Sequence, residues 1–482
     1  MGEALSNWED REDRPHEECG VFGIYAPGED VARITFFGLY ALQHRGQESA
    51  GIATVGGNGQ VGIHRRMGLV AQVFDEDDLL GLQGDMAVGH TRYSTTGSSR
   101  IENAQPLVME SALGPFALAH NGNLTNTAAL RKRLLDAGET LDSSSDSEIL
   151  AKLLARAPGS TWIQKIRRTM RDLSGAYSLV VGTTNGLYGI RDPQGVRPLC
   201  IGRLGEHWVI ASESCAIDTV GGELLREVAP GEVVMIDGVG EEGMRHTVGQ
   251  VSVKSAMCLF EYIYFARPDS IINGRSLYLA RQRMGAELAK EYQVEADLVI
   301  GVPDSATPAA VGYANARQLP YTDGLIKNRY IGRTFIQPDQ HLRQLGVKLK
   351  FNALAAVLEG KRVIVIDDSI VRGTTIRPLV ELLRRSGARE VHLGITSPPF
   401  RHPCYLGVDL AQYSELIAAR LPSVERIAEE VGVDSLHYLS LDGLVRAIDL
   451  PPEAFCSGCF TGHYPVPVDE ATTKLALEGS GV

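Results

Sequence analysis

Residues 363–375 read VIVIDDSIVRGTT, and this stretch decides the fold of the second half of the chain. A run of branched apolar residues predicts a buried strand that ends in two carboxylates, Asp367 and Asp368. A turn of small residues then leads into a helix expected over 374–385, and a further strand is expected over 391–395. A βαβ unit of this kind belongs to a parallel sheet. The unpaired amides where the helix begins can bind a phosphate, and the carboxylates suit ribose hydroxyls or hydrated Mg²⁺.

The same alternation continues on the N-terminal side of this stretch. A helix is predicted over 276–292, a buried strand over 297–301, and a loop over 301–308 that enters another helix. From Cys19 to about residue 250 the texture differs, because short β-type runs alternate with turns and a few helical stretches. Stacked sheets covered by helices are expected there. The fold class is therefore a two-domain α/β and α+β protein.

Composition limits the classes of function. The 482 residues carry a net charge of −12, which argues against a protein that attracts nucleic acid through its overall electrostatic field. No run of about 18 apolar residues occurs, so no membrane span is expected. Residues 1–18 are acidic and lack an apolar core, which excludes a signal peptide. These features predict a cytoplasmic protein, in which the seven cysteines stay reduced.

As a whole, the run 363–375 resembles the phosphoribosylpyrophosphate (PRPP) loop of the type I phosphoribosyltransferases. An isolated Asp-Asp pair would more often be an acidic turn at a strand end, and the Gly-Lys-Ser/Thr ending of a Walker loop is missing. The resemblance implies that Asp367 and Asp368 face the ribose and Mg²⁺. It also implies that the 5′-phosphate is surrounded by Ser369, Gly373, Thr374 and Thr375, and that Ser305 contacts Mg²⁺ or pyrophosphate. The basic stretch 327–350 would cover the polyanion, although such a run is often only a solvated surface.

Four motifs in the first half resemble the glutamine amidotransferase domain of the N-terminal-nucleophile type, whose fold is an αββα sandwich. They begin at Arg45, His90, His120 and Ser145 (Ser145-Asp146-Ser147-Glu148), and Cys19 precedes them. A glutamine amide is a poor electrophile, so its hydrolysis needs a strong nucleophile, a proton acceptor and an oxyanion site. A thiol at a chain terminus has an α-amine of pKa about 7.7–8.0 beside it as a base. We therefore expect residues 1–18 to be a propeptide whose removal leaves Cys19 first.

That resemblance also assigns the residues that bind glutamine. It implies an oxyanion hole formed by the Asn121 side chain and the Gly122 amide. Arg92 would bind the carboxylate of glutamine, and Asp146 would bind its ammonium group.

The remaining cysteines divide into two groups. Cys200 and Cys215 lie in strand-like surroundings and are expected to be inert core residues. Cys456 and Cys459 form a CxxC, which by itself leaves zinc, a redox pair and coincidence open. The segments around Cys258, Cys404, Cys456 and Cys459 resemble the cluster-bearing branch of the amidophosphoribosyltransferases. This implies a structural 4Fe–4S cluster on four thiolates, with zinc as the alternative.

The resemblance to the amidophosphoribosyltransferase family extends from Cys19 to about residue 467. It implies a glutamine amidotransferase domain over 19–250, a phosphoribosyltransferase domain with the cluster segment over 251–467, and a flexible tail over 468–482. The implied reaction converts glutamine, PRPP and water into 5-phosphoribosylamine, pyrophosphate and glutamate, the committing step of purine synthesis. A homotetramer inhibited by purine nucleotides is implied as well.

Three rival functions fit less well. An amidotransferase that makes glucosamine phosphate or asparagine would lack the Asp367-Asp368 loop. A PRPP-sensing regulator would need a nucleic-acid-binding module and has no use for Cys19. A stand-alone glutaminase leaves the second half of the chain unexplained.

Overall fold

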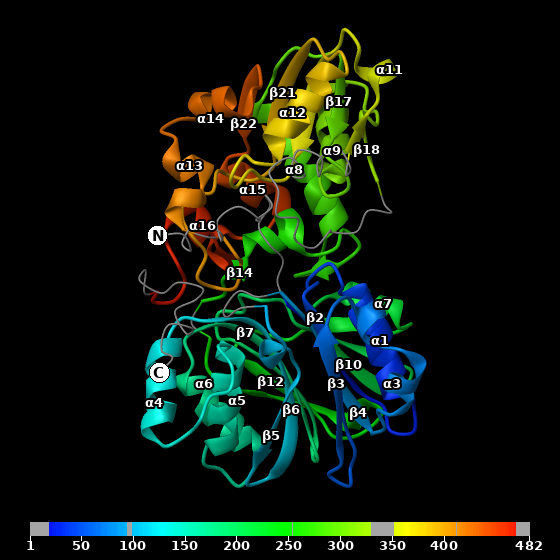
Figure 1. Cartoon of the computed structure of the whole chain (residues 1–482), viewed down its shortest axis with the longest axis vertical. Helices are drawn as coiled ribbons and strands as arrows, with labels where there is room; N and C mark the ends of the chain where they lie inside the picture. Colours follow the sequence, from blue (N-terminus) through cyan, green and yellow to red (C-terminus); the bar gives the residue numbers. More distant parts are fainter. Residues whose placement is uncertain (1–18, 94–98, 253, 329–350, 411, 469–482) are drawn as a thin grey trace, which may run out of the picture.

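The computed structural model describes residues 19–93, 99–252, 254–328, 351–410 and 412–468. Two domains lie end to end, with the N-terminal one at the bottom of Figure 1. The expected propeptide, most of the expected basic cover and nearly all of the expected tail fall outside the described residues. Within the described part of the chain, none of the helices has the length and apolar character needed to cross a membrane.

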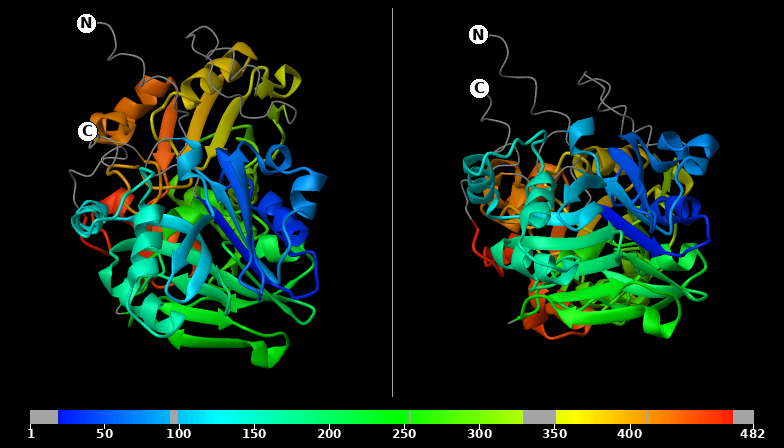
Figure 2. Two further views of the ribbon diagram at one scale, coloured as in Figure 1. Left: turned by 60° about the horizontal axis from the view of Figure 1, so that its bottom comes forward. Right: turned by 90° about the horizontal axis from the view of Figure 1, so that it is seen from below.

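Two antiparallel sheets form the centre of the N-terminal domain (Figure 2). The seven-stranded sheet has the order β11-β9-β10-β1-β4-β2-β3. In chain order these strands are β1 (Gly20–Tyr25), β2 (Ser49–Val55), β3 (Val61–Met67), β4 (Met86–Arg92), β9 (Cys200–Leu204), β10 (His207–Ala211) and β11 (Glu223–Glu227). The six-stranded sheet has the order β13-β12-β8-β7-β6-β5. Its strands are β5 (Leu107–Ser111), β6 (Gly114–Leu124), β7 (Gly175–Thr183), β8 (Gly186–Arg191), β12 (Glu232–Ile236) and β13 (Met244–Val248).

Three apolar layers hold these sheets together. Small and branched residues such as Val21, Val88 and Val180 pack between the two sheets. A second layer lies under helices α1 (Val31–Ala41), α2 (Val70–Val73), α3 (Glu76–Leu80) and α7 (Ser214–Thr219). A third lies under α4 (Thr127–Asp136), α5 (Asp146–Arg156) and α6 (Trp162–Asp172). This arrangement confirms the predicted αββα sandwich.

The C-terminal domain contains the predicted parallel sheet, with the order β17-β20-β21-β22. These strands are β17 (Leu298–Gly301), β20 (Arg362–Asp367), β21 (Glu390–Ile395) and β22 (Ser435–Tyr438). Helices α8 (Leu277–Glu291), α9 (Thr307–Arg317) and α15 (Leu441–Ile448) pack together, and α12 (Ile376–Arg385) packs on α14 (Val424–Val431). The helix predicted from residue 374 begins two residues later, because Thr374 and Thr375 belong to the turn.

Short elements complete the domain and join it to the first one. The strand β14 (Met257–Cys258) pairs in parallel with β23 (Phe455–Cys456), and a π-helix, η3 (Glu261–Phe265), follows β14. Two further two-stranded pairs are β15 (Ile271–Ile272) with β16 (Arg275–Ser276), and β18 (Leu325–Lys327) with β19 (Phe351–Ala353). Among the residues described, this domain also has one-turn α-helices at α11 (Ala355–Leu358), α13 (Ile417–Arg420) and α16 (Gly458–Thr461).

Candidate active sites

Cys19 lies directly before β1, at the centre of the seven-stranded sheet. The register pairs Gly20 with Thr91 of β4, which brings Cys19 next to Arg92 at the end of that strand. The Cys19 thiol is buried and donates a hydrogen bond to the Tyr93 carbonyl at 3.3 Å. Burial raises the pKa of this thiol to about 11, although the Tyr93 contact and the Arg92 charge lower it. At neutral pH the thiol therefore keeps its proton until a base removes it.

A small pocket opens beside this thiol. Several of the residues predicted to act on glutamine lie around it together, although they come from four separate parts of the chain. The pocket is lined by Cys19, Arg92, Tyr93, Gln105, His120, Gly122, Ser145, Asp146 and Ser147. Of these, Gln105 was not singled out from the sequence.

Asn121 is buried on β6 next to this pocket. Among the described residues, neither its side-chain nitrogen nor its side-chain oxygen has a hydrogen-bond partner. Burying an amide without a hydrogen-bond partner costs about 1–3 kcal/mol of stability. A ligand oxygen that accepts a hydrogen bond from the Asn121 N–H would remove that penalty. Gly122 follows with φ of +147°, and a Cβ there would lie 2.0 Å from the Ala176 carbonyl oxygen. Only glycine fits this close strand approach.

Asp146 and Arg92 have protein partners in this structure. Asp146 begins helix α5, and its Oδ2 accepts a hydrogen bond from the Leu124 amide at 3.0 Å. Arg92 is buried, and its Nη1 lies 3.2 Å from Glu48 Oε2. A glutamine carboxylate would therefore compete with Glu48 for the Arg92 guanidinium. The sequence did not reveal the ion pair between Arg92 and Glu48.

The acidic loop of the C-terminal domain follows β20. Asp367 ends the strand, and its Oδ1 accepts a hydrogen bond from the Asp368 amide at 2.9 Å. The Asp368 carboxylate accepts hydrogen bonds from the Ser369 hydroxyl at 2.7 Å and from the Ser305 hydroxyl at 2.6 Å. Ser305 comes from the loop after β17, so the structure brings the two predicted loops together. Oxygen donors of this kind suit Mg²⁺, which binds to one or two carboxylates and to substrate phosphates.

The turn after Asp368 leads into α12. Gly373 has φ of +84°, and a Cβ there would lie 2.8 Å from Ile417 Cδ1. Thr374 and Thr375 directly precede α12, where the Arg377 amide donates to the Gly373 carbonyl at 3.3 Å and Pro378 has no amide hydrogen. Nearby, Lys327 pairs with Asp304 at 2.9 Å. Lys327 is the described part of the basic stretch predicted to cover the substrate.

The four cysteines predicted to hold a cluster converge near the β14–β23 pair. Cys258 and Cys456 are direct neighbours in its parallel register. Burial, and then the nearby thiols, raise the pKa of Cys456 to about 12, and burial followed by Cys404 and the other two thiols raises the pKa of Cys459. All seven cysteines are free, and Cys200 and Cys215 are buried as predicted, with Cys215 in helix α7, which packs against strands β9, β10 and β11.

The arrangement of these thiols bears on the kind of metal group that could bind. Across the described ranges, no group of three or more His, Cys, Asp or Glu side chains is arranged to hold a metal ion. Four cysteine thiolates are the usual ligands of a 4Fe–4S cluster, and they also bind zinc in Cys₄ sites. The cluster therefore stays a prediction, with zinc as the alternative.

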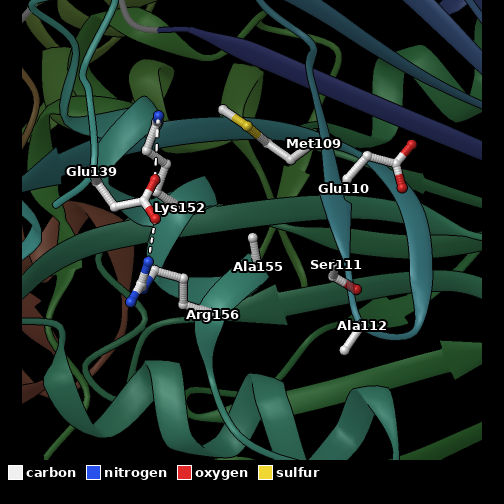
Figure 3. Close-up of a pocket in the computed structure, with 8 residues that line it drawn as sticks. All are labelled: Met109, Glu110, Ser111, Ala112, Glu139, Lys152, Ala155 and Arg156. Carbon is white, nitrogen blue, oxygen red and sulfur yellow. Dashed lines mark hydrogen bonds and ion pairs between the residues drawn. The ribbon is translucent and has the colours of Figure 1, made fainter. Parts of the chain in front are cut away.

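The N-terminal domain has another hollow (Figure 3). Its volume is about 310 Å³, and it is lined by Met109, Glu110, Ser111, Ala112, Glu139, Lys152, Ala155 and Arg156. Glu139 pairs with Arg156, and Lys152 lies 3.6 Å from Glu139. The residues predicted to bind substrate do not line it, and its cations are already paired, so we assign it no role.

Comparisons with known proteins agree with both domains. A glutamine amidotransferase domain matches residues 90–219, and a phosphoribosyl transferase domain matches residues 269–435. The amidophosphoribosyltransferase of Synechococcus elongatus is 52% identical over 477 residues, which is 97% of this chain and 96% of that one. The chain belongs to the amidophosphoribosyltransferase family.

Other members of the amidophosphoribosyltransferase family match over similar lengths. The Bacillus subtilis enzyme is 47% identical over 95% of this chain and 96% of its own. A solved glutamine PRPP amidotransferase from Bacillus subtilis, complexed with ADP and GMP, has a TM-score of 0.88 and 46% identity, covering 94% of this chain and 99% of its own. The chain catalyses glutamine-dependent transfer of ammonia to C1 of PRPP, the first step of de novo purine biosynthesis.

Proposed function

We propose that Cys19 is the nucleophile that releases ammonia from glutamine, and that the loops around Asp367 and Ser305 hold PRPP. The observation that carries the first assignment is the unpartnered amide of Asn121 beside the Cys19 pocket. A site that stabilises an oxyanion needs a hydrogen-bond donor that is already in position before the reaction begins. The proposal includes the domain limits 19–250 and 251–467, the propeptide 1–18 and the tail 468–482.

The glutaminase half-reaction then follows from the residues of this pocket. Once residues 1–18 are removed, the α-amine of Cys19 accepts the thiol proton, and the sulfur bonds to the amide carbon of glutamine. The Asn121 side chain and the Gly122 amide donate to the oxyanion, while Arg92 and Asp146 hold the carboxylate and ammonium of glutamine. The C–N bond breaks as the amine returns the proton to the leaving nitrogen. Water then hydrolyses the thioester to glutamate and restores the thiol.

The second half-reaction takes place in the C-terminal domain. Asp367 and Asp368 hold the ribose hydroxyls, and the 5′-phosphate lies against Ser369, Gly373, Thr374 and Thr375. Ser305, Asp367 and Asp368 would hold Mg²⁺, which supplies positive charge to the departing pyrophosphate. Ammonia bonds to C1 as the C1–pyrophosphate bond breaks. Free ammonia is mostly protonated in water, so we propose a closed passage between the two sites.

The cluster, the regulators and the assembly complete the proposal. Cys258, Cys404, Cys456 and Cys459 would hold a 4Fe–4S cluster with a structural role, supported by their free thiols and by the proximity of these thiols to one another. The Bacillus subtilis relative in complex with ADP and GMP supports inhibition by purine nucleotides. We also propose a homotetramer in the cytoplasm, where thiols stay reduced. Sedimentation with and without ADP and GMP, alongside activity, tests the assembly and the inhibition.

Replacing Cys19 by alanine tests the central assignment. Glutamine-dependent activity should be lost, whereas activity with a high concentration of ammonium salt should remain. Cys200→Ala is the matched control, because Cys200 is a buried thiol in the same sheet and outside the pocket. Loss of both activities in Cys19→Ala, with both retained in the control, would show that Cys19 serves the fold rather than the reaction.

A further inference from the structure

A network of buried charges lies behind Cys19, between the two domains. Its core consists of Arg45, Arg197, Glu213 and Glu261, whose side chains are all fully buried. None of these residues belongs to the substrate sites proposed above. Moving a charge out of water costs several kcal/mol, and an ion pair of this kind is weak support for stability. The network therefore calls for a reason other than stability.

Arg45 is the member of the network that touches the nucleophile. Its Nε donates to the Cys19 carbonyl at 3.1 Å. The two Nη atoms donate to both carboxylates, at 2.6 Å to Glu213 and at 2.6 and 3.0 Å to Glu261. A planar guanidinium held on both sides has a fixed orientation. The Cys19 carbonyl, which stays in place when residues 1–18 leave, is therefore held by a fixed donor.

Glu261 reaches this arginine from the other domain. It begins the π-helix η3, whose residues Tyr262 and Ile263 pack in the core of the C-terminal domain. Arg281 of helix α8 is buried and donates to the Tyr262 carbonyl at 2.9 Å and to the Ala266 carbonyl at 2.7 Å. The backbone that carries Glu261 is thus fastened to a helix of the phosphoribosyltransferase domain.

Glu261 also approaches the oxyanion side of the glutamine pocket. Its Oε1 lies 3.7 Å from Arg197 Nη1, and Arg197 donates to the Leu406 carbonyl at 2.6 and 3.0 Å. The next residue, Gly407, packs so closely that a Cβ there would lie 3.3 Å from the Gly122 carbonyl carbon. One carboxylate is therefore linked to the nucleophile through Arg45 and to the oxyanion strand through Arg197.

We propose that Glu261 is a positioning residue for glutamine hydrolysis: the phosphoribosyltransferase domain uses it to hold Arg45 on Cys19 and Arg197 beside the Gly122 strand. This inference rests on the proposed role of Cys19. Nucleophile and oxyanion donors must keep their spacing for attack, and a misplacement of about 1 Å can reduce the rate about 100-fold. Because Glu261 of the C-terminal domain holds Arg45 and Arg197, the geometry of the glutamine site in the N-terminal domain depends on this carboxylate.

The variant Glu261→Gln keeps the shape and removes the charge. The glutamine-dependent kcat should fall about 100-fold. The ammonia-dependent kcat and the KM for PRPP should stay within about twofold of the parent, because neither depends on Cys19. Glu232→Gln is the matched control, since Glu232 is a buried carboxylate of the N-terminal domain that pairs with Arg226, away from Cys19. It should retain both activities.

A second variant separates positioning from folding, because Glu261→Gln removes a buried negative charge that lies close to both Arg45 and Arg197. The double variant Arg45→Met with Glu261→Gln removes one positive and one negative charge, and should show the same selective loss of glutamine-dependent activity. Equal loss of both activities, retention of both, or failure of both variants to fold would overturn the proposal. Cys19→Ala, measured in parallel, distinguishes the two claims: if Cys19→Ala retains glutamine-dependent activity, the proposed nucleophile itself is wrong.

Discussion

The Ser305 hydroxyl donates a 2.6 Å hydrogen bond to Asp368 Oδ2, across the ends of neighbouring parallel strands. This contact joins the loop expected to meet pyrophosphate to the loop expected to hold ribose. Replacing Ser305 by alanine should therefore weaken PRPP binding, because Asp368 loses a donor that orients it and Mg²⁺ loses an oxygen ligand.

The expected change is a rise of about tenfold in the KM for PRPP, since a hydrogen bond to a charged group contributes about 1.5 kcal/mol. Glutamine-dependent and ammonia-dependent rates should change together, because both use PRPP. Ser386→Ala is a suitable control, because Ser386 follows the far end of α12. An effect on the glutamine-dependent rate alone would contradict the assignment of Ser305.

Asn121→Ala should remove a donor to the oxyanion. The glutamine-dependent kcat is expected to fall about 10²–10³-fold, while the ammonia-dependent rate stays unchanged. The variant should be at least as stable as the parent in thermal unfolding, because the parent buries an amide without a partner among the described residues. Asn126→Ala, at a half-buried position of the same domain that does not line the pocket, serves as the control for activity. A clear loss of stability in Asn121→Ala would indicate a structural role instead.

How well the sequence predicted these sites depends on how far apart along the chain the contacting residues lie. The PRPP loop was predicted because a strand, two carboxylates and a turn follow one another along the chain. The bond between Arg45 and Glu261 joins residues 216 positions apart, and no periodicity indicates such a pair. The same holds for Arg92 with Glu48, whose ion pair arises from the register of β2 and β4.

The pH profile should separate the base from the thiol. Burial raises the pKa of the Cys19 thiol to about 11, so the resting thiol stays protonated through the working range. The α-amine must be uncharged to accept that proton, and its ordinary pKa is about 7.7–8.0. The glutamine-dependent kcat/KM should therefore rise as pH increases through about 8 and then level off well below pH 11. A profile that keeps rising toward pH 11 would mean that the thiol ionises without the amine.

Iron content should depend on the four clustered thiols. Cys456→Ser, purified without oxygen, is expected to lose most of its iron and sulfide, because Cys456 is paired in register with Cys258 and lies near the other two thiols. Cys215→Ser should keep the parent content, since Cys215 lies in the core of the N-terminal domain. The visible absorption spectrum and metal analysis check both. A colourless parent protein that contains zinc would contradict the cluster.

The most direct measurement of the central claim is the mass of the active enzyme after treatment with an electrophilic analogue of glutamine. The account predicts a chain that begins at Cys19 and carries one analogue on that residue, with loss of glutamine-dependent activity in proportion to the label. An active enzyme that retains residues 1–18, or one inactivated by a label on another residue, would contradict it.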